Sequence, residues 1–451
     1  NGHIRVKNVQ AVDVANIAKM TLNATQAGKS VYFYGPASNL NDLTVNAAND
    51  VRVYGGLMAK DTILNAGDDV KLWGGTYTFD SLTAVAADDI VIYGTLNTVN
   101  ANFNAGDDIW LDGYQTYTGN LNATAGDDIT IDWELTAATA TLNAGDDVRI
   151  HGTTHFGDLI VNAGDDISVK GSHVITGTST LKAVDNISMR DTMSINNLDA
   201  TAGNNIHLHG SGTGFIFKLS AGNDIHVHGN YSTDFFGAFA VDDVYLHGNN
   251  STGVLTLNAG DDIHVKGNTV ATVANLIASD HISLRDTVSI DLLSADGNSI
   301  SVYGTVNVNS ANYTASLGDV RLDGYQTYGT LNATAEDDIY IGWELNATTA
   351  TLNAEDDISI RGTTRFGDLT VNAGDDISIR GDHATTGTAN LTAVDYVSLR
   401  DILNFGNLNV TAGNSISAYG TLNATNANYT ATAGDVRLDG YQTYGILNAT
   451  A

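Results

Sequence analysis

One short motif returns along almost the whole chain, and this repetition limits the fold more than any other feature. Its clearest copy, at residues 142–152, reads Leu-Asn-Ala-Gly-Asp-Asp-Val-Arg-Ile-His-Gly. We call the apolar residue after the acidic pair the anchor; there are 22 anchors, spaced 18 to 20 residues apart. So short and regular a period is typical of a solenoid, in which one turn cannot bury its apolar face alone and stacks on its neighbours. The anchors are Val31, Val51, Val70, Ile90, Ile109, Ile129, Val148, Ile167, Ile187, Ile206, Ile225, Val244, Ile263, Ile282, Ile300, Val320, Ile339, Ile358, Ile377, Val397, Ile416 and Val436.

Apolar and polar residues alternate within each repeat, which is the pattern of a β-strand with one buried face. Glycine and aspartate punctuate the strands, and Gly171 is predicted to end the strand that starts at Ile167. No stretch shows the sustained apolar stripe of a helix. The residues predicted to point inward around one turn are Val148, Ile150, Leu159, Val161, Ile167 and Val169.

These patterns predict an all-β fold, a right-handed parallel β-helix of about 22 coils with 19–20 residues each. The handedness follows from the general rule for parallel crossovers. We expect one elongated domain: residues 1–30 form irregular N-terminal coils, and residues 31–451 form a continuous β-helical stalk. The single proline fits such a chain, because nearly every backbone N–H is needed for strand pairing.

A slower repeat lies on top of the coils. The segment at 111–117, Leu-Asp-Gly-Tyr-Gln-Thr-Tyr, returns at 322–328 and 438–444, and an Arg-Asp pair at 190–191 returns at 285–286 and 400–401. These separations indicate growth by copying blocks of about five to six coils. Because the chain begins and ends inside the repeat, we expect it to be an interior part of a longer protein.

The Asn-Ala-Gly-Asp-Asp-Ile repeat, in an acidic, cysteine-free and proline-poor chain, resembles the stalk of filamentous-haemagglutinin-like exoproteins, the adhesins that Gram-negative bacteria export by two-partner secretion. The resemblance covers roughly residues 31–451. It implies a right-handed β-helical rod located outside the cell, on the bacterial surface or in the biofilm matrix.

The composition excludes some partners and sites. The formal net charge of −31, from 51 acidic and 20 basic residues, argues against nucleic acid, whose phosphates require clustered cations. No apolar run is long enough for a membrane span. Without cysteine, there is no thiolate metal site. No enzyme is predicted, because catalysis needs one unique preorganised site and these carboxylates recur in every turn.

The Gly-Asp-Asp turns form the first candidate site. Stacked carboxylates about 5 Å apart repel by roughly 1 kcal/mol even in water. A calcium ion would relieve this repulsion, since it prefers carboxylate and carbonyl oxygens. Alternatively, each aspartate caps its own turn by accepting backbone N–H bonds. No cofactor is required, and the candidate Ca²⁺ ligands are Asp107, Asp108, Asp127, Asp128, Asp146, Asp147, Asp165 and Asp166.

The second candidate site is a column of outward residues three positions after each anchor, first aromatic and then basic. Such a stripe on an acidic chain could bind an anionic partner, either matrix polysaccharide or the acidic edge of a neighbouring rod. Charge balance with the adjacent aspartates is the structural alternative. The proposed binding residues are His151, Lys170, Arg190, His209, His228, His247, Lys266, Arg285, Arg361, Arg380 and Arg400.

Histidines gather on outward positions of four successive coils, at His207, His209, His226, His228, His247 and His264. Imidazoles at this spacing could bind a transition metal or simply be solvated.

The sequence as a whole predicts a structural and adhesive stalk that attaches cells to one another or to matrix. A self-assembling filament or surface-layer subunit is the first alternative, and a polysaccharide-active β-helix enzyme is the second.

Overall fold

The computed structural model describes residues 2–7, 9–10 and 19–451. It divides into two compact units, Asn1–Gly222 and Asn223–Ala451. Every regular element among the described residues is a strand, and no helix there is suited to cross a membrane. The strands of the first unit are β1 (Ile4–Val6), β2 (Val9–Gln10), β3 (Lys19–Ala24), β4 (Val31–Phe33), β5 (Ala37–Ala47), β6 (Val51–Val53), β7 (Leu57–Ala66), β8 (Val70–Ala86), β9 (Ile90–Ala105), β10 (Ile109–Ala125), β11 (Ile129–Ala144), β12 (Val148–Ala163), β13 (Ile167–Ala183), β14 (Ile187–Ala202), β15 (Ile206–Thr213) and β16 (Ile216–Ala221). Those of the second unit are β17 (Ile225–Ala240), β18 (Val244–His247), β19 (Asn250–Ala259), β20 (Ile263–Ala278), β21 (His281–Gly297), β22 (Ser299–Ala315), β23 (Val320–Ala335), β24 (Ile339–Ile341), β25 (Glu344–Ala354), β26 (Ile358–Ala373), β27 (Ile377–Ala393), β28 (Val397–Ala412), β29 (Ile416–Ala431) and β30 (Val436–Thr450).

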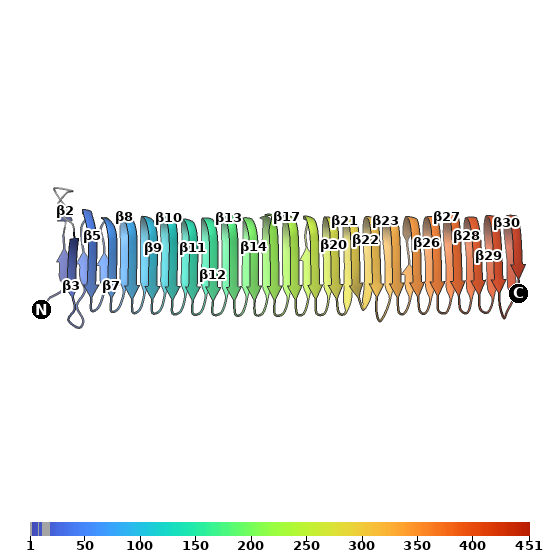
Figure 1. Cartoon of the computed structure of the whole chain (residues 1–451), viewed down its shortest axis with the longest axis horizontal. Helices are drawn as coiled ribbons and strands as arrows, with labels where there is room; N and C mark the ends of the chain where they lie inside the picture. Colours follow the sequence, from blue (N-terminus) through green and yellow to red (C-terminus); the bar gives the residue numbers. More distant parts are fainter. Residues whose placement is uncertain (1, 8, 11–18) are drawn as a thin grey trace. The chain divides into compact units, whose positions relative to one another are not determined.

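Within each unit, every coil pairs in parallel with the next. Between β12 and β13, Val148 lies opposite Ile167 and Ile150 opposite Val169, so equivalent positions of successive coils are neighbours. Figure 1 shows the long strands of each unit running in one direction, with the turns between coils along one edge. This confirms the predicted all-β parallel β-helix.

The number of coils agrees with the anchor count. The described part of the first unit has eleven coils, because the short strand β1 pairs with β4 and starts a coil before the first anchor. The second unit has twelve coils. The predicted number was about 22, and the right-handed sense of coiling stays a prediction.

The inward face of the coils is the hydrophobic core. All six residues predicted to point inward are buried; the most exposed of them, Val169, shows only 4% of its surface. Lys170, the next residue along β13, is exposed. The alternation therefore separates core from surface, and burial of these β-branched and leucine side chains drives the stacking of the coils.

Gly171 bends its strand without ending it, so the predicted strand end is wrong. β13 continues through Gly171 to Ala183, and Gly171 lies in register with Gly152 of the preceding coil. Its φ is +124°, and a Cβ placed there would lie 2.0 Å from the carbonyl oxygen of Gly152. Only glycine allows this backbone conformation and close approach without strain.

A buried polar pair explains the motif that recurs at 111–117. The Gln115 side-chain amide donates to the carbonyl oxygens of Gly94 and Asp112, both at 3.3 Å. Its own oxygen accepts a hydrogen bond from the Tyr117 hydroxyl at 3.2 Å. Because buried polar groups need partners, glutamine and tyrosine must be copied together. The equivalent pairs are Gln326 with Tyr328 and Gln442 with Tyr444.

Candidate functional site: the acidic edge and two outward columns

The turns that join successive coils carry the acidic pairs, and we call the line of these turns in each unit the acidic edge. The second aspartate of a pair accepts a hydrogen bond from the backbone N–H of the equivalent residue one coil later. Asp108 accepts from the N–H of Asp128, and Asp128 accepts from that of Asp147, both at 3.0 Å. In the second unit, Asp338 accepts from the N–H of Asp357 at 2.9 Å. The prediction that each aspartate caps its own turn is wrong for these residues, because the bond joins neighbouring turns.

Asp127 and Asp375, each the first aspartate of its pair, are exposed and surrounded by like charges. Partial desolvation raises the pKa of Asp127, and the carboxylates of Asp107 and Asp146 raise it further. In the second unit, desolvation and the neighbouring Asp376 raise the pKa of Asp375 in the same way. The second aspartate is not free of this repulsion: desolvation raises the pKa of Asp338, the neighbouring Asp357 and Asp319 raise it further, and the hydrogen bond from the Asp357 backbone opposes the rise.

The residues one position after each anchor lie beside the acidic edge, and we call them the near column. Arg52 lies 3.0 Å from Asp50, and Lys71 lies 2.7 Å from Asp69. These side chains neutralise part of the charge on the acidic edge. Further contacts of this kind join Arg149 to Asp128 and Asp147, His226 to Asp224, Tyr245 to Asp243 and His264 to Asp262.

The residues three positions after each anchor form the far column, which is the stripe that the sequence proposes as a binding surface. Strand pairing places its members in register within each unit. Its basic and histidine members in the first unit are His151, Lys170, Arg190 and His209, and those in the second unit are His228, His247, Lys266 and Arg285, followed farther along by Arg361, Arg380 and Arg400.

The lysines and arginines of the far column are exposed and have no carboxylate within 4.0 Å among the residues that the structure describes. These positions lie two residues, roughly 7 Å, farther along the strand from the acidic edge. The carboxylates of Asp286 and Asp401, which directly follow Arg285 and Arg400, accept hydrogen bonds from the backbone N–H groups of Gly267 and Gly381. His151 differs, since its Nδ1 lies 3.6 Å from Asp132. The unpaired residues are Lys170, Arg190, Lys266, Arg285, Arg361, Arg380 and Arg400.

Neutral side chains hold the far-column arginines. The Nε atoms of Arg361 and Arg400 donate to the hydroxyls of Ser359 and Ser398, both at 3.1 Å. The guanidinium of Arg361 also lies 5.4 Å from the ring centre of Tyr340. These contacts orient the guanidinium groups while leaving their positive charge unneutralised.

The aromatic part of the far column packs on itself. The rings of Tyr34 and Tyr54 are nearly parallel, with centres 5.5 Å apart, and those of Trp73 and Tyr93 meet edge to face at 5.6 Å. Such ring pairs stabilise neighbouring coils. Since the tyrosine rings stack on each other, we assign this part a structural role.

The outward histidines of the second unit stack with a tyrosine. The ring of Tyr245 lies 4.7 Å from that of His226 and 5.0 Å from that of His264. Desolvation lowers the pKa of His228 and of His247, and neighbouring histidines lower it further. Among the described residues, no group of three close metal-binding atoms includes a histidine.

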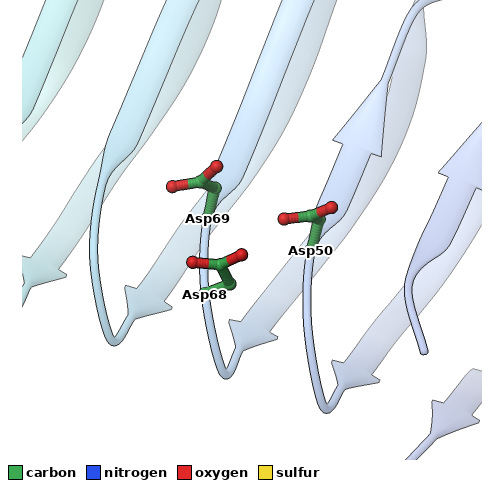
Figure 2. Close-up of side chains that lie close together, drawn as sticks. All are labelled: Asp50, Asp68 and Asp69. Atoms are coloured by element: carbon green, nitrogen blue, oxygen red, sulfur yellow. The ribbon is translucent and has the colours of Figure 1, made fainter. Parts of the chain in front are cut away.

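Carboxylates do come close enough to share a cation at several turns of the described chain. Of the eight aspartates predicted as Ca²⁺ ligands, only Asp165 and Asp166 belong to such a group, which Asp185 completes. The other groups are Asp50 with Asp68 and Asp69, shown in Figure 2, Asp242 with Asp243 and Asp261, Asp261 with Asp262 and Asp280, and Asp375 with Asp376 and Asp395.

Two inward histidines were not predicted. His173 and His383 are buried, and their Nδ1 atoms bond to the hydroxyls of Thr154 and Thr364. Burial lowers the pKa of His173 to about 4 and that of His383 to about 3, so both are neutral near pH 7. Their inward position follows from the alternation of β13 and β27 once these strands continue past their corner glycines.

Comparison with protein-family models, with curated proteins and with solved structures finds no match to this chain. The argument for function therefore depends on the geometry of the two columns and of the acidic edge.

Proposed function

We propose that this chain is the structural and adhesive stalk of a secreted or cell-surface bacterial exoprotein, and that the far column contacts acidic polysaccharide of the extracellular matrix. The observation that carries the proposal is the state of its basic residues. Arg361, Arg380 and Arg400 are exposed, in register and without a carboxylate partner among the described residues. Charge balance with the acidic edge therefore does not account for them.

A repeating cation array suits a repeating polyanion. Successive coils are about 4.8 Å apart, so adjacent arginines of the column present charges at a regular interval along the strand-stacking direction. Guanidinium groups bind carboxylates and sulfates through paired hydrogen bonds, and their weak hydration lowers the cost of contact. No single pocket is needed, which fits a surface made by copying coils.

The test compares two triple variants of the full chain. Replacing Arg361, Arg380 and Arg400 by serine should weaken binding to alginate, a polyuronate, by about tenfold, because three exposed ion pairs of about 0.5 kcal/mol each are lost. Binding by the unaltered chain should also fall as salt shortens the Debye length below about 8 Å. The neutral polysaccharide dextran should bind neither protein.

The control is the near-column variant in which Arg52, Lys71 and Arg149 become serine, since it removes the same formal charge. Those residues already pair with aspartates, so alginate binding should stay close to that of the unaltered chain. An equal loss in both variants would show that only net charge matters and would overturn the role of the far column.

A self-assembling filament is a second candidate, because the acidic edge of one copy is itself a repeating polyanion. The specific observation is the run of exposed first aspartates, such as Asp127 and Asp375, whose carboxylates have raised pKa. Light scattering separates the two proposals. Association that rises with protein concentration without alginate, and disappears in the far-column variant, would favour the filament.

A further inference from the structure

Two exposed aromatic pairs, one in each unit, lie at a corner of the coil, and we call them the corner pairs. In the first unit, Tyr114 of β10 meets Trp133 of β11, with ring centres 6.4 Å apart and ring planes at 78°. In the second unit, Tyr325 and Trp343 repeat this arrangement at 6.4 Å and 76°. All four side chains are exposed, and the two tryptophans show 60% and 57% of their surface.

The backbone of Trp133 is strained. Its φ is +91°, whereas the residues in register with it in the coils before and after are the glycines Gly113 and Gly152. The other described non-glycine residues with positive φ are aspartates, and two of them, Asp286 and Asp401, accept a hydrogen bond from a backbone N–H. Trp133 has no such bond to explain its conformation. A bulky exposed residue kept in a strained conformation indicates a role beyond folding.

The two corner pairs reach the same arrangement through different backbones. Trp133 lies inside the continuous strand β11, whereas Trp343 lies in the break between β24 and β25 and does not have a positive φ. The distances and angles between the rings nevertheless agree. What the two copies share is therefore the arrangement of the rings and not the conformation of the chain.

A glutamate follows each of these tryptophans. The chain has only four glutamates, and two of them are Glu134 and Glu344. Strand pairing places Glu134 opposite Tyr114 and Glu344 opposite Tyr325. Neither glutamate has an ion pair within 4.0 Å among the residues that the structure describes. Each corner pair thus has a carboxylate beside it whose charge is not neutralised.

In the second unit, Tyr325, Trp343 and Glu344 line one hollow of about 390 Å³, together with Gly362 and Thr363. Because glycine has no side chain, the coil after Trp343 leaves this side of the corner open. The first unit has the same residue types in register, since Gly152 lies opposite Trp133 and Thr153 opposite Glu134. A hollow of this size can hold a small organic ligand.

The basic side chains of the described residues do not lie over the rings of the corner pairs. Arg361, the far-column residue of the coil after Trp343, donates to Ser359 and lies 5.4 Å from the ring centre of Tyr340. In the first unit the equivalent far-column residue is His151, which lies 3.6 Å from Asp132. The ring faces and the glutamate therefore remain available to a cation from outside the chain.

We propose that each corner pair binds a quaternary ammonium group, such as the trimethylammonium group of choline. Ring faces attract cations, and two rings at nearly right angles offer two faces to one compact cation. A flat sugar ring would use only one of them. The glutamate supplies the complementary charge, and the net charge of −31 favours a cationic ligand over an anionic one. The inference depends neither on the far column nor on any polysaccharide.

The experiment is an NMR titration of choline chloride with the full chain, which follows the broadening of the trimethylammonium proton resonance. The unaltered chain should broaden this resonance, but should broaden much less that of dimethylbutanol, the neutral molecule of the same shape. Combining Trp133→Gly with Trp343→Gly should remove the broadening. Folding should survive, because glycine occupies this corner in neighbouring coils. The control Trp73→Ala removes an exposed tryptophan that no glutamate follows, and it should leave the broadening unchanged.

The glutamates allow a control that is matched in charge. Combining Glu134→Gln with Glu344→Gln should weaken choline binding about threefold, because an exposed ion pair contributes modestly. Combining Glu336→Gln with Glu355→Gln changes the net charge equally at exposed residues of the acidic edge, and binding should stay as it was. Equal weakening by the two double variants would mean that only net charge attracts the cation, and the corner sites would be rejected.

The melting temperature distinguishes binding from packing. Trp133→Gly relieves the positive φ, so the melting temperature should change little. A marked fall in melting temperature with unchanged choline broadening would make the rings packing elements and overturn the proposal. No broadening of choline by the unaltered chain, or stronger broadening of glucose than of choline, would overturn it as well.

Sedimentation with phosphatidylcholine vesicles identifies the source of the ammonium group. Vesicle binding that the double tryptophan variant loses would indicate a lipid headgroup as the ligand. Binding of free choline without vesicle binding would indicate a soluble ligand at the same two sites.

Discussion

The near and far columns both point outward from the same strands, yet their basic residues are in opposite states. Arg149, in the near column, contacts two aspartates of the acidic edge. Arg380, in the far column, is exposed without an ion pair among the described residues. The two positions differ by only two residues along a strand. A distance of roughly 7 Å along the strand thus separates the near-column cation, which stabilises the turns, from the far-column cation, which is available to a partner.

The same comparison holds for aromatic neighbours. Tyr245, in the near column, donates from its hydroxyl to Asp243 at 2.7 Å, so it belongs to the acidic edge. Tyr419, in the far column, lies 5.7 Å from the guanidinium of Arg400. This part of the near column is therefore tied to the turns, whereas aromatic and hydroxyl groups orient the far-column arginines. Arg321 and Arg437 of the near column instead pair with Asp323 and Asp439 of the far column, at 3.1 and 3.2 Å.

The largest predicted effect tests whether the far column lies outside the core. Val169→Asp places an unpaired charge in the core and should lower the free energy of unfolding by several kcal/mol. Lys170→Asp, the adjacent far-column position, should change it by only about 0.5 kcal/mol. Urea unfolding followed by circular dichroism measures both. Similar losses in the two variants would mean that the assigned faces are wrong.

The fold was predictable because its signal is local and repeated. Val169 and Lys170 alternate within one strand, and every coil repeats the pattern, so the core face and the register followed directly from the spacing. The sequence pattern does not reveal the buried histidine His173, because Gly171 is predicted to end its strand. Its positive φ turns the chain while pairing with Gly152 continues, and His173 then lies on the inward face.

The site was predictable only in part. The sequence identifies which residues share a column, because the period fixes their register. It does not show that Arg149 reaches Asp128 of the preceding coil, since that contact joins residues 21 positions apart through side-chain geometry. Nor does it distinguish Asp50 from the other aspartates, because the burial of its Oδ1 depends on packing around one particular turn.

A second prediction contrasts inward and outward histidines. His383 is buried between Phe366 and Phe405, and desolvation lowers its pKa to about 3, with Arg365 contributing. In the unfolded chain its pKa returns to about 6.5. As the pH falls, His383 therefore binds a proton in the unfolded state before it does so in the folded state. The contribution of neutral His383 to the free energy of unfolding is complete above about pH 6.5 and declines steadily down to about pH 3.

By about pH 5 the loss due to His383 should reach about 2 kcal/mol. His383→Gln should remove that part of the pH dependence, whatever its effect at neutral pH. The outward control is His247→Gln, which should alter the slope less because its imidazole is partly solvated. Free energies of unfolding measured between about pH 7 and 5 test this. Identical slopes for the unaltered chain and His383→Gln would contradict the buried, neutral state.

The smallest predicted effect separates the two columns directly. Arg149→Ser should lower the free energy of unfolding by up to about 1 kcal/mol, because it leaves Asp128 and Asp147 without their shared cation. Arg380→Ser should leave it nearly unchanged, since no described carboxylate depends on that residue. The difference should shrink in about 1 M NaCl, where the Debye length is about 3 Å. If Arg380→Ser cost as much stability as Arg149→Ser and responded equally to salt, the far column would also balance charge within the chain, and its assignment as a contact surface would lose its physical basis.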